Sequence, residues 1–140
     1  SSRRALTGRS SGRERGLDRG DLGRRGIPLL KPTAAIPPAE TLLSAATDKV
    51  RALVSVDGKI SGSLIETYQT AAHGLAWLAT YVESLRQMQG WATRLKEDGK
   101  FGEVEQLIHQ IAFGEYLNQI RGGIPMNQGE VLRLQDIGLS

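Results

Sequence analysis

Two histidines, His73 and His109, are the side chains of this sequence that titrate near neutral pH, so they are the first candidates for a general base or a metal ligand. Glu105 precedes His109 by one helical turn, and Glu103 lies further back. Either role would require a carboxylate that converges on the ring. Neither histidine belongs to an HExxH or Glu-x-x-His arrangement, so a di-metal helical bundle has no support. We therefore interpret both as half-buried helix histidines that make one hydrogen bond.

Other reactive residue types are scarce. The chain contains no cysteine, which excludes disulfide scaffolds, thiolate metal sites and cysteine nucleophiles. It also lacks the GxxxxGK[ST] phosphate-binding loop, the GxSxG nucleophile motif and any acidic pair that stands out. We therefore predict no metal site, and the sequence assigns no catalytic or cofactor-binding residue and does not decide whether the chain is an enzyme.

Two further groups of residues are candidates for binding sites. Residues 122–130 (GGIPMNQGE) could bring the backbone close to a ligand, but they lack GxGxxG spacing and a preceding strand. We interpret them as a helix stop followed by a turn. Trp77, Tyr81, Met88 and Trp91 could line a flat cofactor or acyl pocket. Packing in a helical core is the interpretation we adopt for them.

Charge is distributed unevenly along the 140 residues, whose net charge is +3. Residues 1–26 contain eight arginines against three acids, a net charge of +5, whereas the remainder contains ten basic and twelve acidic residues. This Arg/Gly/Ser-rich tail has too few apolar side chains to offset its ordering entropy, so we predict a disordered tail or linker. Because no apolar run approaches the ~20 residues of a membrane-spanning helix, we expect no membrane partner and a cytoplasmic location.

The remaining sequence is organised as a Pro-rich segment followed by helices. Residues 27–38 contain four prolines and predict an extended strap. A first helix is expected at roughly residues 39–56, ended by the Asp57-Gly58 turn. The link at residues 99–102 is short, so the helices on either side of it should be antiparallel neighbours.

The second expected helix is long, Leu64–Asp98, and begins at a capping-box spacing, Ser63 to Glu66. It carries two apolar stripes, which predict neighbours on two sides and a place in the middle of a bundle. Gly74 and Gly90 within it are expected at a bend, a break or a close helix crossing. The third helix is expected at Glu103–Arg121, ended by Gly122-Gly123. Its apolar face is assigned to Val104, Leu107, Ile108, Ile111, Phe113, Tyr116, Leu117 and Ile120. The sequence thus predicts an all-α fold, a small helical bundle centred on a long antiparallel hairpin within a domain at residues 39–140.

A family resemblance adds to this interpretation. The stretches HGLAWLATYVESLRQMQGWATRL (73–95) and IHQIAFGEYLNQIRGGIPMNQGEVLRLQDIGL (108–139) resemble the helical N-terminal region of bacterial acyl-CoA dehydrogenase-like flavoproteins. The resemblance implies a helical fragment of an oxidoreductase that would use FAD in a full-length parent. No residue here matches the catalytic carboxylate or the flavin-contacting segments of that family.

Two functions follow as hypotheses. In the first, the chain is a helical assembly domain of such a flavoenzyme, which packs against the rest of the enzyme or a second copy and is not catalytic alone. It would then hold no cofactor by itself, and acyl-CoA would be relevant only in the parent. In the second, it is a stand-alone interaction module whose basic tail binds nucleic acid or another polyanion. We prefer the first, because the tail lacks interleaved aromatic residues and three acids dilute its charge.

Overall fold

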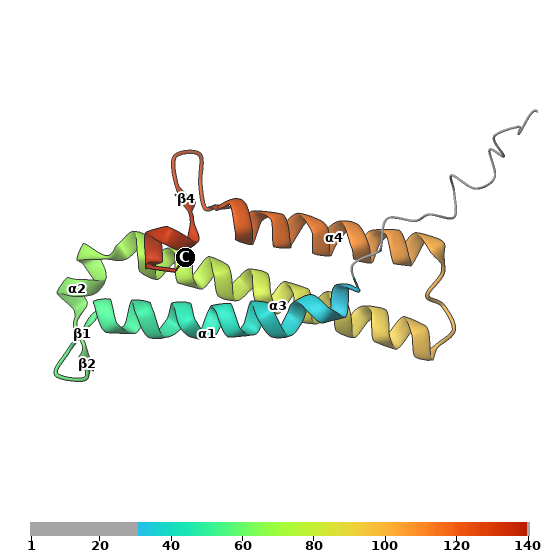
Figure 1. Ribbon diagram of the computed structural model, residues 1–140, viewed down its shortest axis with the longest axis horizontal. Helices are drawn as coiled ribbons and strands as arrows, with labels where there is room; N and C mark the ends of the chain where they lie inside the picture. Colours follow the sequence, from blue (N-terminus) through green and yellow to red (C-terminus); the bar gives the residue numbers. More distant parts are fainter. Residues whose placement is uncertain (1–30, 140) are drawn as a thin grey trace, which may run out of the picture.

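Three long helices, each antiparallel to the next, form the body of the protein (Figure 1). The computed structural model describes residues 31–139, so the predicted disordered tail at 1–26 lies outside the described residues. The long helices are α1 (Ile36–Leu53), α3 (Gln69–Glu97) and α4 (Glu103–Gly122). The shorter elements are η1 (Pro32–Ala35), β1 (Ser55–Val56), β2 (Lys59–Ile60), α2 (Gly62–Thr67), β3 (Ile124–Pro125), β4 (Val131–Leu132) and η2 (Leu134–Ile137). The predicted all-α class is confirmed.

The Pro-rich segment is helical from Pro32 onwards and extended only at Lys31 among its described residues, which corrects the predicted extended strap at 27–38. Pro32 opens η1, and α1 begins at Ile36 with prolines in its first turn, where a missing N–H costs no hydrogen bond. Ile36 packs against the core and Ala39 is buried in it, so tertiary packing favours the helical conformation over the extended one. Residues 27–30 lie outside the described residues, and the domain boundaries stay predictions.

The first helix ends earlier than predicted. α1 stops at Leu53, and Asp57-Gly58 is instead the two-residue turn of a hairpin that joins β1 to β2. Both turn residues have positive φ, 49° at Asp57 and 75° at Gly58, which suits the right-handed twist of paired strands. The hairpin returns the chain so that the Ser61 N–H donates to the Val54 carbonyl at 2.9 Å.

The prediction of a single helix at Leu64–Asp98 is also wrong at its start. The helical conformation is interrupted at Tyr68 (φ −106°, ψ 30°), which separates α2 from α3. α2 begins at Gly62, and no side chain caps it, so the predicted capping box at Ser63 does not form. The Ser63 hydroxyl pairs with that of Ser61 at 3.0 Å instead. Tyr68 is 38% exposed, although Leu64 before it packs against the core and Ala71 after it is buried there.

α3 is the central helix, as the two apolar stripes predicted, because it packs against α1 on one side and α4 on the other. The antiparallel arrangement of α3 and α4, the link at residues 99–102 and the stop after Gly122 are confirmed as well. The buried core joins the three long helices through small and aliphatic side chains and two aromatic rings: Ala46, Val50, Leu78, Tyr81, Val82, Leu85, Phe113 and Ile120.

The C-terminal segment packs across the three long helices. The β3–β4 hairpin and η2 bury Ile124, Leu132 and Ile137, each at most 2% exposed. Gly74 of α3 faces Leu132, and a Cβ there would lie within 3 Å of the leucine side chain, so this glycine marks a close contact with the β3–β4 hairpin and not the predicted bend, break or helix crossing. α3 continues unbroken through Gly90. Within residues 31–139, no helix is long and apolar enough to cross a membrane.

Candidate functional site

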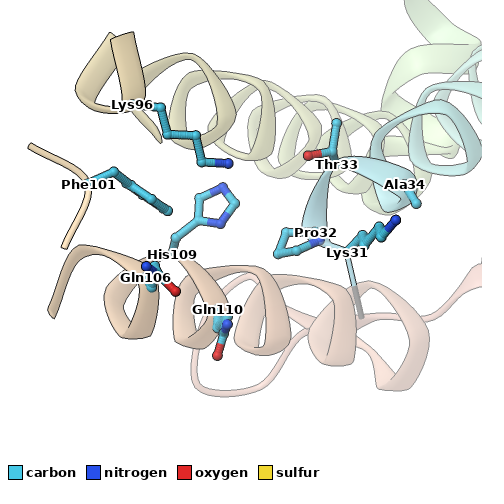
Figure 2. Close-up of a pocket in the computed structure, with 9 residues that line it drawn as sticks. All are labelled: Lys31, Pro32, Thr33, Ala34, Lys96, Phe101, Gln106, His109 and Gln110. Carbon is cyan, nitrogen blue, oxygen red and sulfur yellow. The ribbon is translucent and has the colours of Figure 1, made fainter. Parts of the chain in front are cut away.

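A pocket of about 510 Å³ lies where the start of the described chain meets the end of α3 and the first turns of α4 (Figure 2). Residues 31–34 contribute to it together with residues 96–110, which lie more than 60 positions further along the chain. Its lining residues are Lys31, Pro32, Thr33, Ala34, Lys96, Phe101, Gln106, His109 and Gln110. The helix α4 directs His109 towards α3 because His109 lies on the same side of that helix as the core residues Phe113 and Ile120.

His109 is more deeply buried than predicted. It is only 4% exposed, and its Nε2 makes no hydrogen bond with any of the residues 31–139. The ring lies against Phe113 and Phe101, at centroid distances of 4.7 and 6.0 Å. Burial, and then the charge of Lys96, lower the pKa of His109 below its ordinary value. A buried polar atom left without a partner costs about 1–3 kcal/mol, so this nitrogen is a conspicuous feature of the fold.

The pocket is basic. Lys31 and Lys96 are its two charged residues, and none of the nine lining residues is acidic. Lys96 lies over the Phe101 ring, with Nζ 4.8 Å from the centroid. Among the described residues, neither lysine belongs to an ion pair. The arrangement can therefore attract an anion, but it offers no carboxylate base.

Glu105 does not converge on His109. Its Oε2 accepts the Gly102 N–H at 2.9 Å, which caps the N-terminus of α4. In the part of the chain that the structure describes, no three potential ligands gather to hold a metal ion. Among the described residues, His109 therefore has no second residue with which it could act as a general base or hold a metal ion.

His73 lies elsewhere, exposed on α3. Its Nε2 accepts a hydrogen bond from Trp77 Nε1 at 3.0 Å, so the predicted single hydrogen bond is present although the residue is not half-buried.

The aromatic stripe packs as predicted at Tyr81, which is buried in the core, and at Trp77 and Met88, which are partly buried against it. Trp91 lies outside the core cluster and, together with Met88, lines a pocket of about 800 Å³ between α3 and α4. The Tyr81 hydroxyl is hydrogen-bonded to Gln119, and its ring meets Tyr116 edge to face at 4.7 Å.

Residues 122–130 also behave as predicted, as a helix stop and a turn. Gly123 has a φ of 130° and ends α4. The Asn127 side chain accepts the Gly129 N–H at 2.8 Å and donates to Glu130 at 2.6 Å. The Asn127 side-chain amide is therefore engaged in hydrogen bonds within the β3–β4 connection.

A second candidate site is an exposed apolar surface on α4. Val104, Leu107, Ile108 and Ile111 are 62%, 52%, 47% and 69% exposed, and we call these four residues the α4 outer face. Their i, i+3, i+4, i+7 spacing forms one stripe about 10 Å long. From the sequence, these four residues were expected on one apolar face of the helix together with Phe113 and Ile120. The structure divides that set between two opposite sides of the helix.

A known enzyme is similar in sequence to this chain. No protein-family model matches the chain. The (2S)-methylsuccinyl-CoA dehydrogenase of Cereibacter sphaeroides, an acyl-CoA dehydrogenase, is 59% identical over 105 residues, which are 75% of this chain and 19% of that enzyme. The chain thus spans about a fifth of the length of this curated relative. The identity confirms the resemblance to acyl-CoA dehydrogenase-like proteins, and the model is consistent with a helical domain of such an enzyme.

Proposed function

We propose that this chain acts as a helical assembly domain of an acyl-CoA dehydrogenase-like flavoenzyme. In this role the α4 outer face packs against the rest of the enzyme, and the domain is not catalytic alone. FAD, acyl-CoA and the oxidoreductase activity belong to the rest of the parent enzyme, and we place that enzyme in the cytoplasm.

The exposure of the α4 outer face is the observation that carries this proposal. Four large aliphatic side chains in one stripe remain in water although the opposite side of the same helix is buried. Contiguous exposed apolar patches mark interaction surfaces. Because about four fifths of the relative's length lies outside the matched segment, the rest of such an enzyme is large enough to supply the covering surface.

Charge defines what that surface should contain. The exposed carboxylates Glu103 and Glu115 lie on α4 beside the stripe. We therefore expect the partner surface to be apolar at its centre and basic at its rim, since complementary charges set the orientation of docked surfaces.

In this proposal the flavin and the catalytic base lie in the rest of the enzyme. The pocket beside His109 has no acidic residue that could remove a proton from an acyl-CoA.

The test is co-purification of this chain with the tagged remainder of its parent enzyme, expressed as a separate polypeptide. We expect Val104→Glu/Ile111→Glu to weaken the association by at least about tenfold, since burial of each such side chain contributes about 1.5–3 kcal/mol. Lys59→Glu, in the exposed β1–β2 hairpin, changes the net charge by the same two units as the double variant; it is the matched control and should leave the association unchanged. Circular dichroism should show the same helical content in all three proteins.

Two results would contradict the proposal. One is equal co-purification of the double variant and the control. The other is a flavin absorbance band in the chain purified alone, because it would place the cofactor within these residues.

A further inference from the structure

The pocket beside His109 has a charge opposite to that of its surroundings. Residues 31–139 contain ten basic and twelve acidic residues, yet both charged residues of the pocket are lysines. In Figure 2, Lys96 reaches from α3 towards the His109 ring, and Lys31 stands on the other side of the pocket beside η1. Like charges and a neutral, unpaired imidazole thus share one cavity without a counter-ion from the described residues.

We propose that this pocket binds an organic phosphate monoester, whose phosphate is held by the ammonium groups of Lys31 and Lys96. The proposal does not rest on the assembly role, because the pocket and the α4 outer face use different residues of α4. An anion in the pocket supplies the counter-charge that no residue of 31–139 gives the two lysines, and an acceptor for a ring N–H of His109.

Charge and donor type favour phosphate. A phosphate monoester carries close to two negative charges at neutral pH, which matches two lysines, and lysine is a common phosphate ligand in proteins. The side-chain amides of Gln106 and Gln110 also line the cavity and can donate to phosphate oxygens.

Volume and wall composition favour an organic ester over the free ion. At about 510 Å³ the cavity lies within the range of small-molecule sites, larger than a single phosphate group requires. Pro32, Ala34 and Phe101 supply an apolar wall beside the lysines. An aromatic or aliphatic group attached to the phosphate can therefore pack against this wall.

The experiment follows the ring signals of the two histidines by NMR in the full 140-residue chain, titrated with phenyl phosphate at constant ionic strength. His73 is exposed on α3 and serves as the internal control. We expect saturable shifts of the His109 signals alone, with inorganic phosphate binding more weakly than the ester. Lys96→Gln should weaken binding by at least about tenfold, since a hydrogen bond to a charged group contributes about 1.5–3 kcal/mol. Lys59→Gln, in the exposed β1–β2 hairpin, should not.

Several outcomes would overturn the proposal: shifts that do not saturate, equal shifts at His73, or an unchanged affinity in Lys96→Gln while its helical circular dichroism matches the wild type. Equal affinity for phenyl and inorganic phosphate would refute the ester, and equal affinity for acetate would refute phosphate recognition.

Discussion

Replacing Gly74 with alanine probes the contact that fastens the C-terminal hairpin to α3. The added Cβ would lie 2.7 Å from Cδ2 and 2.9 Å from Cγ of Leu132, whereas carbon atoms pack at about 3.5–4.0 Å. Leu132 is 2% exposed, so it cannot move aside into solvent. Overpacking of this kind costs about 1–3 kcal/mol, and the gain from alanine in a helix offsets about 0.5–1 kcal/mol of it. We expect the free energy of unfolding to fall by about 0.5–2 kcal/mol.

Gly114→Ala is the matched control. Gly114 lies inside α4, where an added Cβ would meet no described atom within 4 Å. This variant should therefore gain about 0.5–1 kcal/mol from helix propensity alone. Thermal unfolding followed by helical circular dichroism separates the two variants, because 1 kcal/mol shifts the Tm of a domain of this size by about 4 °C.

A double variant isolates the contact itself. Leu132→Ala removes the atoms that an alanine at Gly74 would meet, at its own cost of about 2–5 kcal/mol. In that background Gly74→Ala should become neutral or stabilising, which gives a coupling energy of about 1–3 kcal/mol. The reasoning is refuted if Gly74→Ala matches Gly114→Ala in stability, or if its effect is the same with and without Leu132.

Two further predictions concern the turn after α1 and the buried histidine. Gly58→Ala should lower the free energy of unfolding, measured by urea titration, by about 1–2 kcal/mol, because Gly58 has a φ of 75°. Gly62→Ala is the control and should not lower the free energy of unfolding, since the φ of Gly62 is not positive. Because burial and Lys96 lower the pKa of His109, the unfolded chain holds that proton more tightly. Stability should therefore fall as the pH drops below the ordinary histidine value of about 6.5, until the folded pKa is passed. His109→Gln should remove this part of the pH dependence and His73→Gln should retain it; equal profiles in the two variants would contradict the assignment.

Local sequence signals determined the end of α3 and both ends of α4 to within one residue. Apolar spacing over many turns, the glycines at 99 and 102 and the Gly122-Gly123 stop are properties of neighbouring residues, so they act before any tertiary contact forms. Gly74 was predicted at a bend, a break or a close helix crossing, whereas in the structure it lies against Leu132 of the β3–β4 hairpin. The central place of α3 followed from its two stripes, because each apolar stripe requires a neighbour.

Where a local sequence signal was compatible with two conformations, contacts formed in the folded protein selected one of them. Proline fits both an extended strap and the first turn of a helix, and the burial of Ala39 selected the helix. Asp-Gly fits both a helix stop and a hairpin turn, and the Val54–Ser61 hydrogen bond accompanies the hairpin. Ser63 has the spacing of a cap, but its hydroxyl pairs with Ser61 instead.

The candidate sites depended on tertiary structure most of all. α4 carries apolar residues around much of its circumference, so the sequence could not indicate which ones α3 covers and which ones form the α4 outer face. The pocket required Lys31 to meet Lys96 and His109, which lie more than 60 positions further along the chain. The sequence by itself determined the helices, whose hydrogen bonds are local. The three-dimensional arrangement decided which sides of those helices are buried, and with it the positions of both candidate sites.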